Sequence, residues 1–150
     1  MKIINSEIRD VTSGQNVRVM TPANLYECEL HDDVFIGPFV EIQKGCVIGR
    51  GSRIQSHTFL CENVTLGEHC FIGHNVTFAN DLFHSGKPDA DAQNWITITL
   101  GDGVTVGSGA TILTETVCSG AVIGAGSVVI RPATVKGIYA GNPARLIRTL

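Results

Sequence analysis

The chain has 150 residues, of which 43% are hydrophobic, and a formal net charge of −3. This length suits a single domain spanning residues 1–150 around one core, and the basic residues form no run typical of a nucleic-acid binder. No stretch approaches the roughly 20 apolar residues of a membrane span, and the first ten residues lack the apolar segment of a signal peptide. We therefore expect a cytoplasmic protein without nucleic-acid or membrane partners. The five cysteines form no CxxC pair, which argues against a disulfide framework or a zinc knuckle.

In chain order, residues 1–23 are the least regular part and predict an imperfect first coil. From Leu25 onward a period of six emerges, and between Ile36 and Ala79 every sixth residue is large and apolar. These lead residues are Ile36, Ile42, Ile48, Ile54, Leu60, Leu66, Ile72 and Phe78. The fifth residue of each repeat is small or β-branched. A period of six matches neither the 3.6 of a helix nor the strict alternation of a long strand.

The period of six is typical of a parallel β-helix, an all-β fold built from hexapeptides. Three hexapeptides make one triangular coil of about 18 residues, so leads one coil apart stack at the ordinary strand spacing of about 4.8 Å. Three walls are expected: one with Ile36, Ile54 and Ile72, a second with Ile42, Leu60 and Phe78, and a third with Ile48 and Leu66.

The regular repeat is interrupted after residue 79. Residues 80–95 are polar and contain Gly86 and Pro88, which cannot continue the coil. The register resumes at Leu100, so about 16 residues form an extruded loop, and loops of this length are usually functional. Later the spacing of leads between 112 and 123 is one residue too short, which predicts a shortened coil near position 118. At the end, Asn142 and Pro143 predict the start of a short helix over about 143–149.

The repeats and the closing phrase GNPAR resemble the hexapeptide-repeat acyltransferases. The resemblance implies a left-handed β-helix, an exception to the usual right-handed crossover, and a homotrimer with sites between neighbouring coils. It also implies acetyl-CoA as co-substrate. The segments IGPFVEIQKG, IQSHTFLCENVTLG and IGHNVTFAND are similar to the subfamily that N-acetylates nucleotide-linked 3-amino sugars. The function that this implies is acetylation of a nucleotide-linked amino sugar for cell-surface polysaccharide precursors.

The pantetheine arm of acetyl-CoA needs backbone amides that are not covered by side chains. The best places are the small residues Ser108, Gly109, Ala110, Ala125 and Gly126. The resemblance also implies that Arg131, Lys136 and Arg145 meet the phosphates. The alternative is that the small residues are only coil corners and the cations only surface charges.

The expected acceptor site lies at the mouth of the loop. Lys44, Glu62 and Asn80 occupy the same repeat position in successive coils, so the repeat predicts a vertical row of side chains facing outward. The resemblance implies that Asn80 holds the sugar amine and that Glu62 orients it, while a backbone N–H stabilises the oxyanion. The proton passes either to Glu62 or to the departing coenzyme sulfur.

The histidines leave other functions open. His57 and His74 lie one coil apart near the same corner and are candidates to line the substrate site. His84 lies in the loop and favours the alternative of a sugar O-acetyltransferase, in which a loop histidine activates a hydroxyl. A third possibility is a zinc protein similar to the γ-class carbonic anhydrases, whose pattern is similar to G-H-x4-H. His74 fits its first histidine but the second falls on Ala79, so no metal is expected. A prism without catalysis explains neither the loop nor the GNPAR tail.

Overall fold

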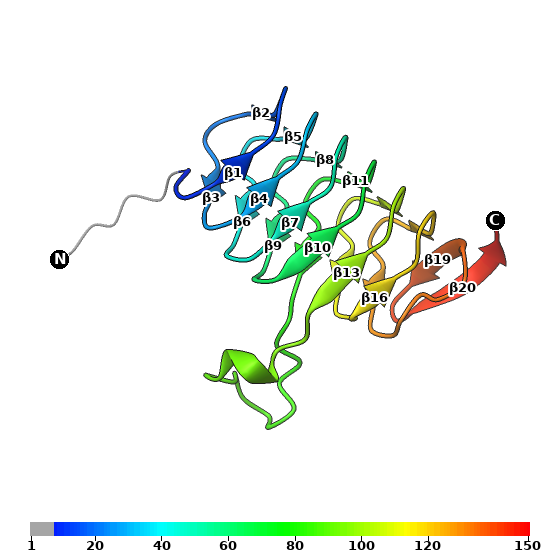
Figure 1. Cartoon of the computed structure of the whole chain (residues 1–150). Helices are drawn as coiled ribbons and strands as arrows, with labels where there is room; N and C mark the ends of the chain where they lie inside the picture. The colour runs from blue at the N-terminus through cyan, green and yellow to red at the C-terminus, as the bar shows by residue number, and fades with distance from the viewer. Residues whose placement is uncertain (1–7) are drawn as a thin grey trace.

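The computed structural model describes residues 8–150, so the first seven residues of the expected N-terminal coil lie outside the described part. The chain winds into stacked coils, and each coil contributes one very short strand to each of three sheets (Figure 1). The prediction of an all-β, left-handed parallel β-helix is confirmed. The three sheets are called the first, second and third wall below.

The walls contain every named strand of residues 8–150. The first wall is β1 (Thr12–Ser13), β4 (Glu29–Leu30), β7 (Val47–Ile48), β10 (Val64–Leu66), β13 (Ile98–Leu100) and β16 (Thr116–Val117). The second wall is β2 (Arg18–Val19), β5 (Phe35–Ile36), β8 (Arg53–Ile54), β11 (Phe71–Ile72), β14 (Thr105–Val106), β17 (Val122–Ile123), β19 (Gly137–Gly141) and β20 (Ala144–Thr149). The third wall is β3 (Asn24–Leu25), β6 (Glu41–Ile42), β9 (Phe59–Leu60), β12 (Thr77–Phe78), β15 (Thr111–Ile112) and β18 (Val128–Val129).

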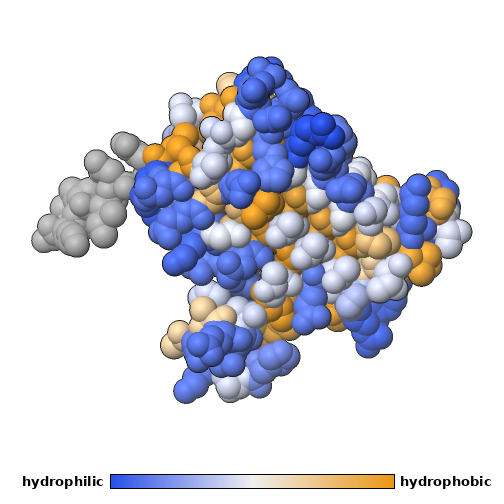
Figure 2. Space-filling view, in the orientation of Figure 1, coloured by the Kyte–Doolittle hydropathy of each residue, from blue (hydrophilic) through white to orange (hydrophobic). Residues whose placement is uncertain are grey.

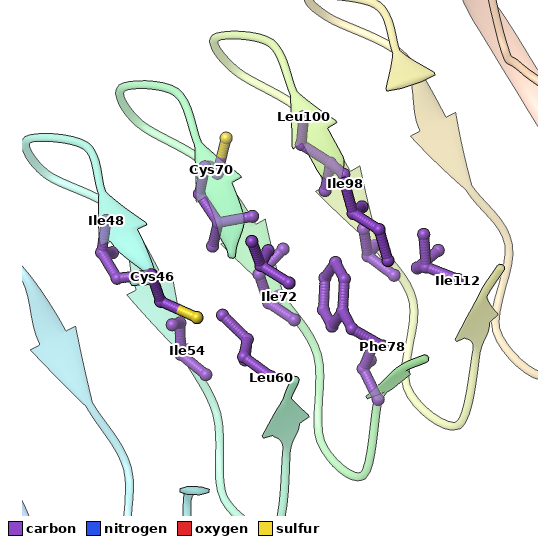
Figure 3. Packing of buried hydrophobic residues seen from close by; sticks show 14 of the residues in the cluster. Cys46, Ile48, Ile54, Leu60, Cys70, Ile72, Phe78, Ile98, Leu100 and Ile112 are labelled. Carbon is purple, nitrogen blue, oxygen red and sulfur yellow. The ribbon is translucent and has the colours of Figure 1, made fainter. Parts of the chain in front are cut away.

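The lead residues form the core, as the period of six predicts. Ile36 pairs with Ile54 and Ile54 with Ile72 in parallel register, and all three are fully buried. The leads of the three walls point toward one another inside the coil (Figure 3). Burying these large aliphatic side chains in one continuous column supplies the main stabilisation of a fold whose strands are mostly two residues long.

Polar residues at the inner fifth position satisfy their hydroxyl groups within the coil. Thr58 Oγ1 donates to the Gly73 carbonyl over 2.8 Å and accepts from the Val76 N–H. Ser52 Oγ makes the equivalent pair of bonds one wall away. A hydroxyl can therefore replace an aliphatic group at this position without an unpaired polar atom.

The loop and the shortened coil also follow the sequence prediction. Leu66 pairs with Leu100, whereas an unbroken repeat would pair it with position 84, so the segment between the two is extruded. The loop leaves the body between β12 and β13 (Figure 1), and carries the 3-10 helix η1 (Ala92–Asn94), the only helix among residues 8–150. Leu100 pairs with Val117, whereas an unbroken coil would bring position 118 into register, so the missing residue lies at the corner between β15 and β16. No helix in residues 8–150 is long and apolar enough to cross a membrane.

The predicted C-terminal helix over 143–149 is wrong. Residues 144–149 form β20, which runs antiparallel to β19 and ends the second wall. Asn142 and Pro143 lie in the turn of this hairpin instead of opening a helix. The physical reason is the open edge of the last coil, whose backbone groups need hydrogen-bond partners. β19 pairs with β17, and β20 then covers β19.

Candidate functional site

The three edges of the prism carry different side chains, and two of them contain the predicted site residues. The edge between the third and first walls, where the loop leaves, is called the loop corner. The edge between the second and third walls, which carries His57 and His74, is called the histidine corner. The edge between the first and second walls is called the charged corner. The candidate site is built from the first two.

Asn80 is the anchor of the loop corner. Its side-chain Nδ2 donates to the Glu62 carbonyl over 3.3 Å, and its own carbonyl accepts the Ile96 N–H over 2.9 Å. Asn80 therefore ties the first and last residues of the loop to the coil above. Only 9% of Asn80 is exposed, so the expected outward orientation of this side chain is wrong: its amide is drawn inward by the Glu62 backbone.

The other members of the expected row lie in the same column. The Asn63 N–H donates to the Lys44 carbonyl, which stacks these two coils, and Glu62 is half-buried at the loop corner. The Lys44 ammonium lies 3.6 Å from a Glu27 carboxylate oxygen, on the side away from Asn80. The structure thus brings Glu62 and Asn80 together, while Lys44 is paired with the coil above.

The loop is ordered by its aspartates. The two carboxylate oxygens of Asp81 accept the backbone N–H groups of Phe83 and Asp89, each over 2.8 Å. The Trp95 indole then donates to the Asp89 carbonyl over 3.1 Å. These bonds hold the loop as a folded unit, and His84 lies on its exposed part.

A small recess lies between the loop and the shortened corner below it. Its volume is about 120 Å³, and it is lined by Leu82, Ile96, Leu113, Thr114, Glu115, Ile130 and Pro132. The Thr114 hydroxyl is buried here without a hydrogen-bond partner among the described residues. The recess is mainly apolar and lies on the same corner as Asn80.

The histidine corner contains a hydrogen-bonded column that crosses three coils. Ser56 Oγ lies 2.8 Å from His74 Nδ1, and the His74 backbone N–H donates to Ser108 Oγ over 3.1 Å. Because Ser56 engages Nδ1, the imidazole ring is held in one orientation, and no described residue bonds to Nε2. One coil above, the His57 ring stacks on Phe39 with centroids 4.8 Å apart.

The small residues predicted for the cofactor continue this column. The Gly109 N–H donates to the His74 carbonyl, and the Gly126 N–H donates to the Ser108 carbonyl. Ala125 is exposed, whereas Ala110 is buried as an inner fifth residue and offers only its backbone. His57, His74 and the small residues therefore share one edge. Glu62 and Asn80 lie at the other edge of the third wall, a distinction that the sequence analysis did not draw.

The three predicted phosphate contacts do not converge. Arg131 follows β18 at the loop corner, and the Lys136 side chain lies against Gly120 at the charged corner. Arg145 lies on β20, where its Nη1 donates to the neighbouring Ala144 carbonyl. The expected helix would have grouped these residues, and the hairpin separates them.

The charged corner was not singled out from the sequence. Arg50 and Glu68 form an ion pair at 2.8 Å, and the His31 ring lies 3.0 Å from a Glu29 oxygen. The recess beside them has a volume of about 420 Å³. This edge is the hydrophilic upper rim in Figure 2. The separation of Arg50 and Glu68 by one coil is the sequence signal that predicts such a pair.

Buried thiols and metal ligands do not contribute a reactive centre. Burial raises the pKa of the Cys46 and Cys61 thiols to about 12, which keeps them protonated and poorly nucleophilic at neutral pH. Within residues 8–150 no three histidine, cysteine, aspartate or glutamate side chains gather as a metal site.

Comparison with known proteins supports this architecture. Residues 27–62 match the family description "bacterial transferase hexapeptide (six repeats)". The bifunctional protein GlmU of Francisella philomiragia is 33% identical over 98 residues, which are 59% of this chain and 21% of that protein. The GlmU protein of Francisella tularensis is 32% identical over the same length. The chain spans about a fifth of the length of these curated relatives.

Solved structures share the fold over nearly the whole chain. A hexapeptide-repeat acetyltransferase of Vibrio cholerae, complexed with acetyl coenzyme A, covers 96% of this chain and is covered for 73%, with a TM-score of 0.65 and 22% identity. Perosamine N-acetyltransferase of Caulobacter crescentus, with CoA and GDP-perosamine, covers 95% and is covered for 58%, with a TM-score of 0.65 and 19% identity. The polySia-specific acetyltransferase NeuO covers 93% and is covered for 81%, with a TM-score of 0.63 and 25% identity. The chain is a hexapeptide-repeat protein with the left-handed β-helix fold of these acetyltransferases.

Proposed function

We propose that the protein is an acetyl-CoA-dependent N-acetyltransferase that acts on the amino group of a nucleotide-linked amino sugar. The observation that carries the proposal is the histidine corner, where exposed small residues lead along one edge to a hydrogen-bonded histidine. The neighbours crystallised with acetyl coenzyme A, or with CoA and a nucleotide-linked amino sugar, support it. Both substrates are made in the cytoplasm, so we assign the reaction to that compartment.

The pantetheine arm would lie along the histidine corner. A Cβ added at Gly126 would meet no atom within 4 Å, and one at Gly109 would meet only the Gly126 nitrogen at 4.0 Å. The backbone at this corner is therefore open to a ligand, and its amide groups can bond to the amides of the arm. An arm in this position directs the thioester toward His74.

The acceptor amine would lie at the loop corner, between Glu62 and Asn80. Asn80 Nδ2 is engaged by the Glu62 backbone, so Oδ1 is the atom that can accept from the amine. In the reaction the amine nitrogen attacks the thioester carbon, the C–N bond forms and the C–S bond breaks. The nitrogen loses its proton to Glu62 or to the departing sulfur. A backbone N–H stabilises the oxyanion.

A homotrimer would bring the two halves together. Within one protomer the histidine corner and the loop corner are opposite edges of the third wall, because β12 runs from one to the other. Side-by-side packing of copies about a threefold axis can place the histidine corner of one copy against the loop corner of the next. Sedimentation is expected to give a trimer, and a stable, active monomer would contradict this arrangement.

The second candidate is a sugar O-acetyltransferase that uses His84 as base. The observation that favours it is the exposed position of His84 on the loop, near the acceptor edge. A hydroxyl has a far higher pKa than an ammonium group and needs such a base.

The test is acetyl-CoA turnover with a panel of nucleotide-linked 3-amino and 4-amino sugars, with simple sugars and serine as controls. Transfer to at least one nucleotide-linked amino sugar, with an amide product identified by mass spectrometry, is expected. Transfer only to hydroxyl groups would establish the second candidate instead.

A further inference from the structure

The outer face of the second wall carries a column of side chains that the proposed reaction has not used. Parallel pairing aligns one outward residue from each strand. From β2 to β19 they are Arg18, Phe35, Arg53, Phe71, Thr105, Val122 and Ile138. The column alternates arginine and phenylalanine over its first four strands and contains no acidic residue.

The arginines of this column are held in place by an aromatic ring. The Arg53 guanidinium lies 4.7 Å from the Phe35 ring centroid, and the Arg18 guanidinium lies 5.8 Å from it on the other side. Neither forms an ion pair with a carboxylate of residues 8–150. A guanidinium that stacks on a ring keeps its N–H edges free, and these edges match the geometry of a phosphate group.

Phe71 is the next residue of the column and has no guanidinium over its ring. It is 40% exposed, although the neighbouring Phe35 is half-buried between two arginines. Phe71 also lies close to the histidine corner, since only the inward Ile72 and the bare Gly73 separate it from His74. The exposed ring, the fixed guanidinium of Arg53 and the proposed site thus adjoin one another.

We propose that Phe71 and Arg53 bind the nucleoside diphosphate of the acceptor substrate. The base stacks on the Phe71 ring, and the diphosphate accepts hydrogen bonds from Arg53. The sugar then extends over Gly73 toward the histidine corner, where the thioester lies. This inference rests on the proposed function and names the part of the chain that recognises the nucleotide.

A second copy of the chain is a poorer occupant for this face. Two such faces in contact would oppose Arg18 and Arg53 of one copy to those of the other, with no acidic residue in the column to offset the repulsion. A dianionic ligand with a planar base complements both the charge and the flat aromatic surface.

The test measures binding separately from turnover. dTDP, UDP and GDP are titrated into the full-length protein by calorimetry, and CoA and ADP are titrated in parallel arms. The Phe71→Leu variant keeps an apolar side chain without a ring, and Arg53→Gln removes the guanidinium. Arg18→Gln is the matched control, because Arg18 stacks on the same Phe35 but lies two strands further from Phe71.

Phe71→Leu is expected to weaken binding of the preferred nucleoside diphosphate by roughly 5- to 100-fold, the range for one lost base–aromatic stack. Phe71→Tyr should restore it. Arg53→Gln should weaken it about tenfold or more, and Arg18→Gln less than twofold. CoA binding should be unchanged in all variants. With a nucleotide-linked amino sugar as substrate, Phe71→Leu should raise KM and leave kcat nearly constant, as expected for lost uniform binding.

Three results would overturn the inference. Equal weakening of CoA and of the nucleoside diphosphate would assign the face to the cofactor. A change of oligomeric state in Phe71→Leu would assign it to an interface between copies. Absence of nucleoside diphosphate binding by the wild-type protein would also refute it, and acetyl transfer in that protein would leave the proposed function intact. Conversely, Phe71-dependent nucleotide binding without acetyl transfer would support the inference and refute the proposed function.

Discussion

The second-position glycines predict a sharp contrast between two alanine substitutions at the charged corner. A Cβ added at Gly49 would collide with the carbonyl of Gly67 in the next coil and would lie 2.7 Å from the Glu68 nitrogen. These are backbone atoms in a stacked coil, so they cannot rotate away. A Cβ added at Gly103 would meet nothing within 4 Å, although its φ of +64° disfavours a side chain.

The expected costs follow from these contacts. In Gly49→Ala the two coils must separate locally, which adds overpacking strain of about 1–3 kcal/mol. It also weakens the ladder bonds from Gly49 N–H to Leu66 and from Gly67 N–H to Leu100, each 2.8 Å long and worth about 1 kcal/mol. The total is roughly 3–5 kcal/mol. Gly103→Ala should cost only about 1 kcal/mol, since the left-handed penalty of about 1–2 kcal/mol is partly offset by a less flexible unfolded chain.

Urea denaturation followed by far-ultraviolet circular dichroism measures both variants under identical protein concentration. The midpoint of Gly49→Ala should fall far below that of Gly103→Ala, with similar m values. For a chain of this size the thermal midpoints should fall by roughly 10 °C and roughly 3 °C respectively. Equal losses, or a smaller loss in Gly49→Ala, would refute the argument that close approach of coils requires this glycine.

Three further predictions concern the loop, the acceptor site and the thiols. Replacing residues 80–95 by a short Gly-Ser turn should leave the coil folded by circular dichroism, because β12 and β13 pair within their own walls, yet lower turnover by about 100-fold or more; full activity would exclude a role over the substrate. Asn80→Ala and Glu62→Ala should each lower kcat/KM by about 10²–10⁴ and His84→Ala little, whereas a large loss confined to His84→Ala would contradict N-acetylation. Burial raises the pKa of Cys28 from 9.0 to about 11, so the folded state loses stability as pH rises through that window; the urea midpoint should be flat below pH 9 and fall by pH 11, and a Cys28→Ala variant should fall less.

The coil could be predicted in detail because its information is local and periodic. Each lead residue repeats the same environment, so an error at one position is corrected by its neighbours in the coils above and below. The loop followed from the same arithmetic. The C-terminal hairpin could not be predicted in this way, since Asn142 and Pro143 carry a genuine local signal for a helix start. The open edge of β17 overrides that signal, and the edge exists only once the coils have stacked.

The site was predicted less completely for a similar reason. Spacing assigns residues to corners, and it correctly stacked Glu62 under Asn80. It does not decide where a side chain points, so the inward turn of the Asn80 amide toward the Glu62 carbonyl was missed. The stacking of Arg53 on Phe35 was accessible in principle, because these residues lie one coil apart. It was overlooked because neither belongs to a motif that carries chemistry.

The hairpin that ends the second wall also determines how far the structure can grow. A β-helix coil presents the same parallel edge after every turn, so a bare last coil would accept a further coil from any molecule with the same repeat. β20 runs in the opposite direction and contains a register shift opposite Ile138 and Tyr139. An incoming parallel coil would meet an antiparallel, irregular edge that matches neither its direction nor its spacing. The hairpin thus acts as a terminator, which protects a modular fold from end-to-end polymerisation.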